Sequence, residues 1–75
     1  MAFIKKYQRL QDLREDFDLT QTEIAGVLHT SQKQYSRWET GDFPIPFEKA
    51  IALAKFYDVS LDYIAGLTNI KDKFW

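Results

Sequence analysis

The chain has 75 residues, a formal net charge of −1 and no cysteine, which excludes disulfides and thiolate metal sites. Its length is that of one domain, expected to span residues 1–75, and 45% hydrophobic residues allow a packed core. No apolar run approaches the roughly 20 residues of a membrane span, and residues 1–10 lack the apolar region of a secretory signal. We therefore expect a soluble, cytoplasmic protein with no membrane partner.

Apolar periodicity predicts an all-α fold of five short helices. Apolar or partly apolar side chains at positions 10, 13, 14 and 17 have the i, i+3, i+4, i+7 spacing of one helix side, which predicts a helix over roughly residues 4–16. Thr20 is a good N-cap for a second helix, and Glu23 completes a capping box. That helix is expected to bury Ile24, Ala25 and Leu28.

The remaining three helices are marked by caps and breakers. Ser31 is the next N-cap, and Gly41 can supply a left-handed stop after a helix over residues 31–40. Pro46 suits the first position of a fourth helix, and Ser60 caps a fifth that ends at Gly66. The buried side of the fourth helix is expected to hold Phe47, Ala50, Ile51, Ala54 and Tyr57.

The two sides of the helix over residues 31–40 differ in chemistry. The helical repeat places Tyr35 and Trp38 on one side, which we expect in the core. Glu39 lies within about 40° of Tyr35 on that side, and Arg14 lies on the apolar side of the first helix. Because charges that face a core must be paired, Arg14 and Glu39 are expected to form a buried ion pair. The opposite side has cations and hydroxyls but no carboxylate: Lys33, Ser36, Arg37 and Thr40.

Two short helices with a tight turn between them describe a helix-turn-helix at about residues 20–40. The stretch LTQTEIAGVLHTSQKQYSRWETG (19–41) resembles the DNA-binding core of the Cro/phage-repressor family. The stretch IPFEKAIALAKFYDVSLDYIAGLT (45–68) resembles the fourth and fifth helices of that family. The resemblance covers roughly residues 7–68, leaves a short tail at 69–75, and implies a five-helix, lambda-repressor-like fold. It also implies the same Arg14–Glu39 bridge.

The resemblance implies a sequence-specific regulator of transcription, a repressor by family habit, that binds operator DNA as a homodimer without a cofactor. The helix over residues 31–40 would lie in the major groove, where a side pressed against phosphates cannot tolerate carboxylates. The residues expected to contact bases are Gln32, Lys33, Gln34 and Arg37. Those expected to contact the DNA backbone are Thr20, Gln21, Ser31, Ser36 and Thr40.

Three positions depart from the family pattern. His29 stands at a turn position that is usually glycine, because the backbone there takes a positive φ; His tolerates that region at modest strain. Asp42 stands in a connector that is often basic in relatives, which predicts fewer phosphate contacts. Gly26 lies inside a helix, where it either marks a close approach or is tolerated surface.

Other functions have weaker support. The acidic run over residues 12–18 is typical of a solvated helix surface, and a single His without partners is a poor metal or catalytic site. No nucleophile triad or phosphate loop is present, so we do not expect an enzyme. The open alternative is a protein-binding module, such as an antitoxin-like partner. For dimerisation, the apolar groups left over are Leu61, Tyr63, Ile64 and residues 73–75, although Leu61 and Ile64 could instead close the core.

Overall fold

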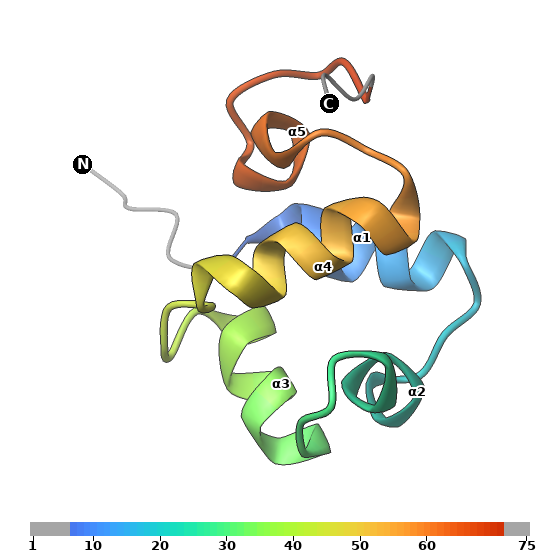
Figure 1. The fold of residues 1–75 in the computed structure, drawn as a ribbon, viewed down its shortest axis with the longest axis vertical. Helices are drawn as coiled ribbons and strands as arrows, with labels where there is room; N and C mark the ends of the chain where they lie inside the picture. The colour runs from blue at the N-terminus through green and yellow to red at the C-terminus, as the bar shows by residue number, and fades with distance from the viewer. Residues whose placement is uncertain (1–6, 72–75) are drawn as a thin grey trace.

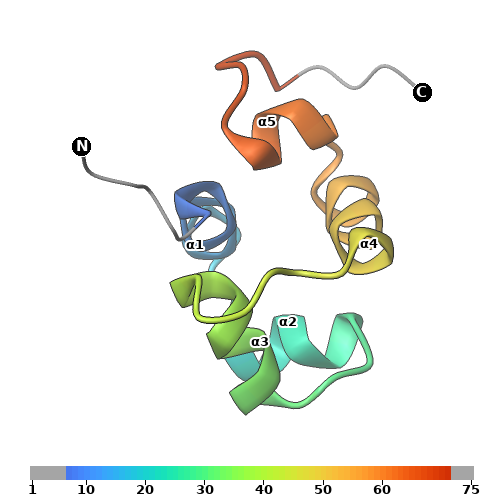
Figure 2. The ribbon, with the colours of Figure 1, turned by 90° about the vertical axis from the view of Figure 1, so that its left-hand side faces the viewer.

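The computed structural model describes residues 7–71, and within this range every regular element is a helix. The helices are α1 (Gln8–Asp16), α2 (Gln21–Val27), α3 (Gln32–Thr40), α4 (Phe47–Tyr57) and α5 (Leu61–Ala65). This confirms the predicted all-α, five-helix fold. Helices α1 and α4 cross the middle of the molecule, with α2 and α3 at one end and α5 at the other (Figures 1 and 2). No helix in residues 7–71 has the length and apolar character needed to cross a bilayer.

The helix ends follow the capping signals of the sequence. The Thr20 hydroxyl accepts the Glu23 N–H, and the Glu23 carboxylate accepts the Thr20 N–H, which completes the predicted capping box. Ser31 and Ser60 are N-caps of α3 and α5, as predicted. The C-caps of α3 and α5 are left-handed glycines, Gly41 (φ 87°) and Gly66 (φ 82°).

Two predicted helix starts are wrong. Tyr7 is the N-cap of α1 with extended backbone (φ −87°, ψ 90°), so α1 begins at Gln8 rather than near residue 4; residues 4–6 lie outside the described range. Pro46, predicted as the first helical position, is instead the N-cap of α4, one residue before its observed start at Phe47, because the ψ of Pro46 is extended at 143°. Periodicity identifies a helix side, but it does not locate the residue at which the backbone becomes helical.

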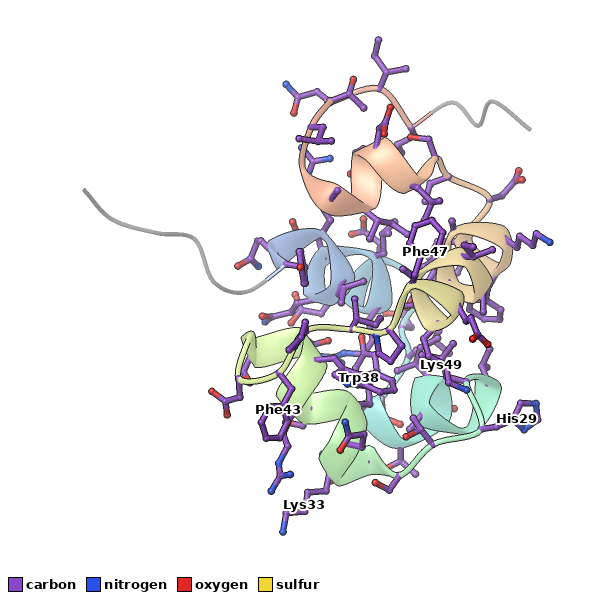
Figure 3. The ribbon with its side chains drawn as sticks, turned by 60° about the vertical axis from the view of Figure 1, so that its left-hand side comes forward. His29, Lys33, Trp38, Phe43, Phe47 and Lys49 are labelled. Atoms are coloured by element: carbon purple, nitrogen blue, oxygen red, sulfur yellow. The ribbon has the colours of Figure 1, made fainter. Side chains whose placement is uncertain are left out.

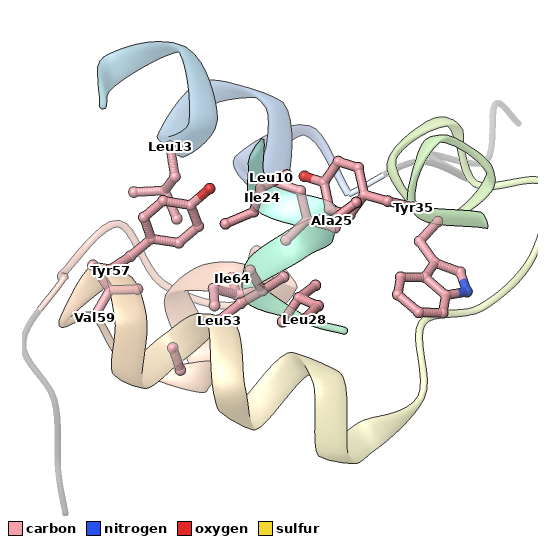
Figure 4. Close-up of a cluster of buried hydrophobic side chains, with 12 residues drawn as sticks. Leu10, Leu13, Ile24, Ala25, Leu28, Tyr35, Leu53, Tyr57, Val59 and Ile64 are labelled. Atoms are coloured by element: carbon pink, nitrogen blue, oxygen red, sulfur yellow. The ribbon is translucent and has the colours of Figure 1, made fainter. Parts of the chain in front are cut away.

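The core takes apolar side chains from all five helices (Figure 4). Tyr35 and Trp38 are buried, as predicted. Ile24 and Ala25 of α2 and Leu28, the residue that follows this helix, are also buried, as predicted. The main members of the cluster are Leu10, Leu13, Ile24, Ala25, Leu28, Tyr35, Trp38, Leu53, Ala54, Tyr57, Val59 and Ile64.

The prediction of which residues of α4 are buried is partly wrong. Phe47 is 71% exposed and Ile51 only half-buried, whereas Leu53 is fully buried. Residues 50, 53, 54 and 57 form the buried stripe, which has the spacing of one helix side. Phe47 is the first residue of α4, and side chains there point back beyond the start of the helix, away from the core. Phe17, on the apolar pattern of α1, is also 48% exposed, although its ring packs edge-on against Tyr57.

Arg9 of α1 holds the segment that follows α5. Its Nη1 donates to the backbone oxygens of Tyr63 (3.2 Å) and Thr68 (3.1 Å), and its Nη2 donates to Asn69 Oδ1 (2.7 Å). The guanidinium also lies 4.0 Å from the centre of the Tyr63 ring. The Ser60 N–H also donates to the Lys71 oxygen. Residues 69 and 71 of the predicted tail are therefore hydrogen-bonded to the helical part of the molecule.

The surface expected to form the dimer is partly used by the core. Ile64 is 4% exposed and belongs to the core cluster, so of the two roles left open for it the structure shows core closure rather than a contact with a second copy. Leu61 and Tyr63 are half-buried, and Leu61 lines an apolar groove of about 450 Å³ together with Ile45 and Phe47. Residues 73–75 lie outside the described range.

Candidate nucleic-acid interface

The turn between α2 and α3 is closed by backbone hydrogen bonds. The Thr30 N–H donates to the Ala25 oxygen (3.0 Å) and the His29 N–H to the Gly26 oxygen (3.2 Å), the pair of bonds that defines a Schellman motif. His29 is the left-handed residue of the motif, with φ 56°, as the sequence led us to expect. Figure 3 shows its side chain directed away from the protein. A Cβ on Gly26 would meet nothing within 4 Å, so no close approach within the described residues explains that glycine.

A lysine from a distant helix supports the same turn. Lys49 Nζ of α4 donates to the Leu28 oxygen at 2.6 Å, which satisfies a carbonyl at the end of α2 and places a cation against the negative end of the helix dipole. Figure 3 shows Lys49 lying over this end of α2. Sequence analysis missed this contact, because residues 21 positions apart carry no local pattern that joins them.

The inner side of α3 is fixed by a hydrogen-bonded cluster around Glu39. Arg14 donates to both carboxylate oxygens, from Nε at 2.9 Å and from Nη2 at 3.2 Å, so the structure pairs the two residues as the sequence led us to expect. The Tyr35 hydroxyl donates to the same carboxylate at 2.9 Å, and Gln21 Nε2 donates at 2.8 Å. Glu39 is 4% exposed, and its acceptor sites are satisfied by three side chains from three helices.

The protonation of this cluster follows from its contacts. Burial raises the pKa of Glu39, but the hydrogen bonds from Arg14, Gln21 and Tyr35 outweigh burial and leave that pKa below its usual value. The hydrogen bond to Glu39 raises the pKa of Arg14 further, and burial raises the pKa of Tyr35. The cluster is therefore one carboxylate, one guanidinium and one neutral phenol at neutral pH.

The residues expected to contact DNA gather at the start of α2 and along α3. The amide of Gln32 donates to Gln21 Oε1 at 2.6 Å, so the first residues of the two helices are joined directly. Lys33 projects from the start of α3 into solvent (Figure 3) and forms no hydrogen bond or ion pair with residues 7–71. The exposed members of the set are Thr20, Ser31, Gln32, Lys33 and Thr40, and the half-buried ones are Gln21, Gln34, Ser36 and Arg37.

The hydroxyls in this set already serve the local fold. Thr20 and Ser31 accept the N–H groups of Glu23 and Gln34 as helix caps. Thr40 Oγ1 donates to the Arg37 oxygen at 3.3 Å. As capping acceptors, Thr20 and Ser31 keep their own O–H free to donate to a phosphate oxygen.

Comparison with known proteins agrees with this geometry. The sequence profile of the helix-turn-helix family matches residues 10–64. The chain belongs to the helix-turn-helix family. This confirms the resemblance to the Cro/phage-repressor type that residues 19–41 and 45–68 indicate.

Several named relatives are helix-turn-helix (HTH) proteins. The chain is 38% identical over 65 residues to an uncharacterized HTH-type transcriptional regulator, YobD, of Bacillus subtilis, an alignment that covers 87% of this chain and 58% of YobD. It is 34% identical over 67 residues to a putative HTH-type transcriptional regulatory protein of Pyrococcus abyssi, covering 89% of this chain and 21% of that protein. It is 34% identical over 55 residues to the HTH-type transcriptional activator BcrR of Enterococcus faecalis, covering 73% of this chain and 27% of BcrR. The chain thus spans 21% to 58% of the lengths of these relatives. No solved structure gives a significant match.

Within the helix-turn-helix unit, the connector after α3 makes a contact that sequence analysis missed. The Arg37 guanidinium carbon lies 5.1 Å from the centre of the Phe43 ring. The Phe43 N–H donates to the Arg37 oxygen at 3.2 Å, which places the ring beside the last turn of α3.

No group of three or more His, Cys, Asp or Glu is placed to hold a metal ion among the described residues.

Proposed function

We propose that this helix-turn-helix protein is a sequence-specific double-stranded DNA-binding regulator of transcription that reads the major groove with α3. In this proposal Gln32, Lys33, Gln34 and Arg37 contact base edges. The backbone is contacted by Thr20, Gln21, Ser31, Ser36 and Thr40. Base contacts give sequence preference, whereas phosphate contacts position the protein.

The observation that carries the proposal is the placement of charge on α3. Glu39 is the only acidic residue of the helix, and it is buried and paired with Arg14. Both cations of the helix, Lys33 and Arg37, lie on the other side, outside that cluster. A chain of net charge −1 therefore presents a local surface that a polyanion can approach without meeting a carboxylate of this helix.

The hydrogen bond between Gln21 and Gln32 supports the assignment of the helix start as a binding end. Each amide uses one donor or acceptor in that bond, and Gln21 uses another toward Glu39, so Gln32 retains both an N–H and its oxygen. Those are the two groups that pair with adenine N7 and N6. The bond also limits the rotamers of Gln32, which lowers the entropy that binding would cost.

Dimerisation is part of the proposal, because one recognition helix covers few base pairs. Two half-sites about one turn of DNA apart, about 34–36 Å, are expected. Leu61 and Tyr63 are half-buried residues of α5, the helix at the end of the molecule opposite α3 in Figure 1. Sedimentation with and without operator DNA tests this. A Leu61→Glu variant that keeps its helical content should bind as a monomer, with lower affinity for a two-site duplex.

Selection of bound sites from random duplexes tests the proposed function itself. We expect an enriched motif with two related halves, and an affinity that falls steeply as salt rises because counterions are released from phosphates. Failure to enrich any duplex would contradict DNA binding and would favour the protein-binding alternative. Repression is the expected outcome of binding, although BcrR carries the word activator in its name. A reporter gene whose promoter carries the selected motif shows whether binding represses or activates transcription.

A further inference from the structure

The proposed function assigns Arg37 to a base edge but gives no role to its contact with the Phe43 ring. Phe43 is 46% exposed and is not among the side chains packed against the hydrophobic core. Figure 3 places its ring beside α3, on the part of the molecule where Lys33 also projects. Phe43 is one of several large apolar side chains exposed at the surface, and among the described residues it is the one whose ring lies against a cation of α3.

The backbone holds Phe43 in place independently of the ring. Gly41 ends α3 in the left-handed conformation, and the Phe43 N–H then returns to the Arg37 oxygen. Pro44 follows, and the residue before a proline is restricted to extended conformations. The ring is therefore presented to Arg37 by a connector with few alternative conformations.

A ring serves Arg37 differently from a carboxylate. An aromatic face attracts the guanidinium without using any of its five in-plane N–H donors, whereas a carboxylate would occupy two of them. Within residues 7–71, the Arg37 side chain donates no hydrogen bond and forms no ion pair with a carboxylate. Arg37 is thus restrained in position while its donors stay free for an acceptor outside the protein.

We propose that Phe43 is a positioning residue for DNA specificity: its ring holds the Arg37 guanidinium so that the N–H edge is presented to a guanine base edge in the groove. This inference rests on the proposed function. An arginine side chain has several rotatable bonds, and ordering them before binding removes part of the entropy cost of base recognition. Phe43 therefore acts through Arg37, and its effect should be confined to the base pair that Arg37 contacts.

The first arm of the test needs no DNA. In the DNA-free full chain, NMR relaxation of the Arg37 Nε–H and the ring-current shift of its side-chain protons report the contact. Phe43→Ala should abolish the shift and increase the mobility of Nε, while Phe43→Tyr should retain both. Phe47→Ala removes another exposed phenylalanine at a distance from Arg37 and should change neither. An unchanged Arg37 signal in Phe43→Ala would overturn the inference whatever the protein binds.

The second arm measures affinity for the selected operator, for single-base variants of it and for a scrambled duplex at one salt concentration. Phe43→Ala should weaken operator binding by about two- to fivefold, lower discrimination at one base pair and leave the scrambled duplex unchanged. In an Arg37→Ala background Phe43→Ala should have no further effect. Equal losses on operator and scrambled DNA, or the same loss without Arg37, would overturn the inference. A wild-type protein that binds no duplex would instead contradict the proposed function. The NMR measurement on the DNA-free chain would still show whether the Phe43 ring restrains Arg37.

Discussion

The two sides of α3 differ in how much of their chemistry the protein itself uses. On the inner side, the Glu39 carboxylate takes hydrogen bonds from Arg14, Gln21 and Tyr35. On the outer side, Lys33 has no hydrogen bond or ion pair with residues 7–71, and Arg37 has a ring contact that leaves its donors unused. On one side of this nine-residue helix the polar groups serve the fold, whereas on the other side its two cations have no hydrogen-bond or ion-pair partner among residues 7–71.

If α3 approaches DNA as proposed, this difference shows where such a helix can carry an acidic residue. A carboxylate on the outer side would repel phosphates, whereas inside it joins α3 to α1 through Arg14. The same charge is a stabilising group in one place and an obstacle in the other. Substitutions on the inner side should therefore act on stability, and those on the outer side on DNA binding.

The largest effect is expected from Arg14→Ala. Removing the guanidinium leaves the Glu39 carboxylate, 4% exposed, without its ionic partner, and such a loss costs about 3–5 kcal/mol of unfolding free energy. Urea or thermal unfolding followed by circular dichroism measures it. Lys33→Ala on the outer side is the control and should stay within about 0.5 kcal/mol of wild type. A melting temperature for Arg14→Ala within a degree of wild type would show that the cluster contributes little.

The two buried tyrosines sharpen the comparison further. The Tyr35 hydroxyl donates to Glu39, whereas the Tyr57 hydroxyl is buried without a hydrogen-bond partner among the described residues, and burial raises the pKa of Tyr57 to about 12. Tyr35→Phe should lower the unfolding free energy by about 1.5–3 kcal/mol, because its bond is to a charged group. Tyr57→Phe loses no bond and should leave stability equal or higher. Equal losses for the two variants would contradict this account.

On the outer side, the expected effects are on binding rather than stability. Arg37→Ala should cost about 1–3 kcal/mol on the operator and relax preference at one base position. Ser36→Ala removes a hydroxyl that makes no hydrogen bond with residues 7–71 and should weaken operator and scrambled duplex alike, because a phosphate contact carries no sequence information. Ser36 is a cleaner control than Gln21, which also donates to Glu39, or Thr40, which donates to the Arg37 oxygen. If Arg37→Ala lowered both affinities equally, Arg37 would be a phosphate contact.

The smallest effect is the pH dependence of stability from one proton on Glu39. Its pKa is lower in the folded protein than the value of about 4.3 in an unfolded chain. The contribution of this group is therefore complete above that value and is lost as pH falls through the lower pKa of the folded state. Unfolding free energies between pH 7 and pH 3 should fall more steeply for wild type than for Glu39→Gln. Parallel curves would show that Glu39 does not titrate as proposed.

Local signals in the sequence located much of this fold. Thr20, Ser31 and Ser60 were identified as caps because each acts on a neighbour three residues away. The inner side of α3 followed from helical spacing, as did the pairing of Arg14 with Glu39. The predicted start of α1 was wrong because periodicity does not locate helix ends. The predicted buried side of α4 was wrong because residues 50–54 are all apolar and surround the helix, which leaves the direction of burial open.

The contacts that escaped prediction join residues without a shared local pattern. Lys49 reaches the Leu28 oxygen from another helix, and Arg9 reaches Thr68 across most of the chain. Phe43 lies in the connector that is often basic in relatives, so the prediction for this segment concerned phosphate contacts and not an aromatic contact with Arg37. Only the tertiary arrangement brings these side chains together.

The central claim is that the outer side of α3 is the surface that meets DNA. The most direct test is an NMR titration of the ¹⁵N-labelled full chain with a short duplex that carries one selected half-site. The account predicts that the largest amide shifts fall at residues 20–22 and 31–37, while residues 61–65 change little. Shifts concentrated on residues 61–65 and 45–50, with α3 unchanged, would contradict it.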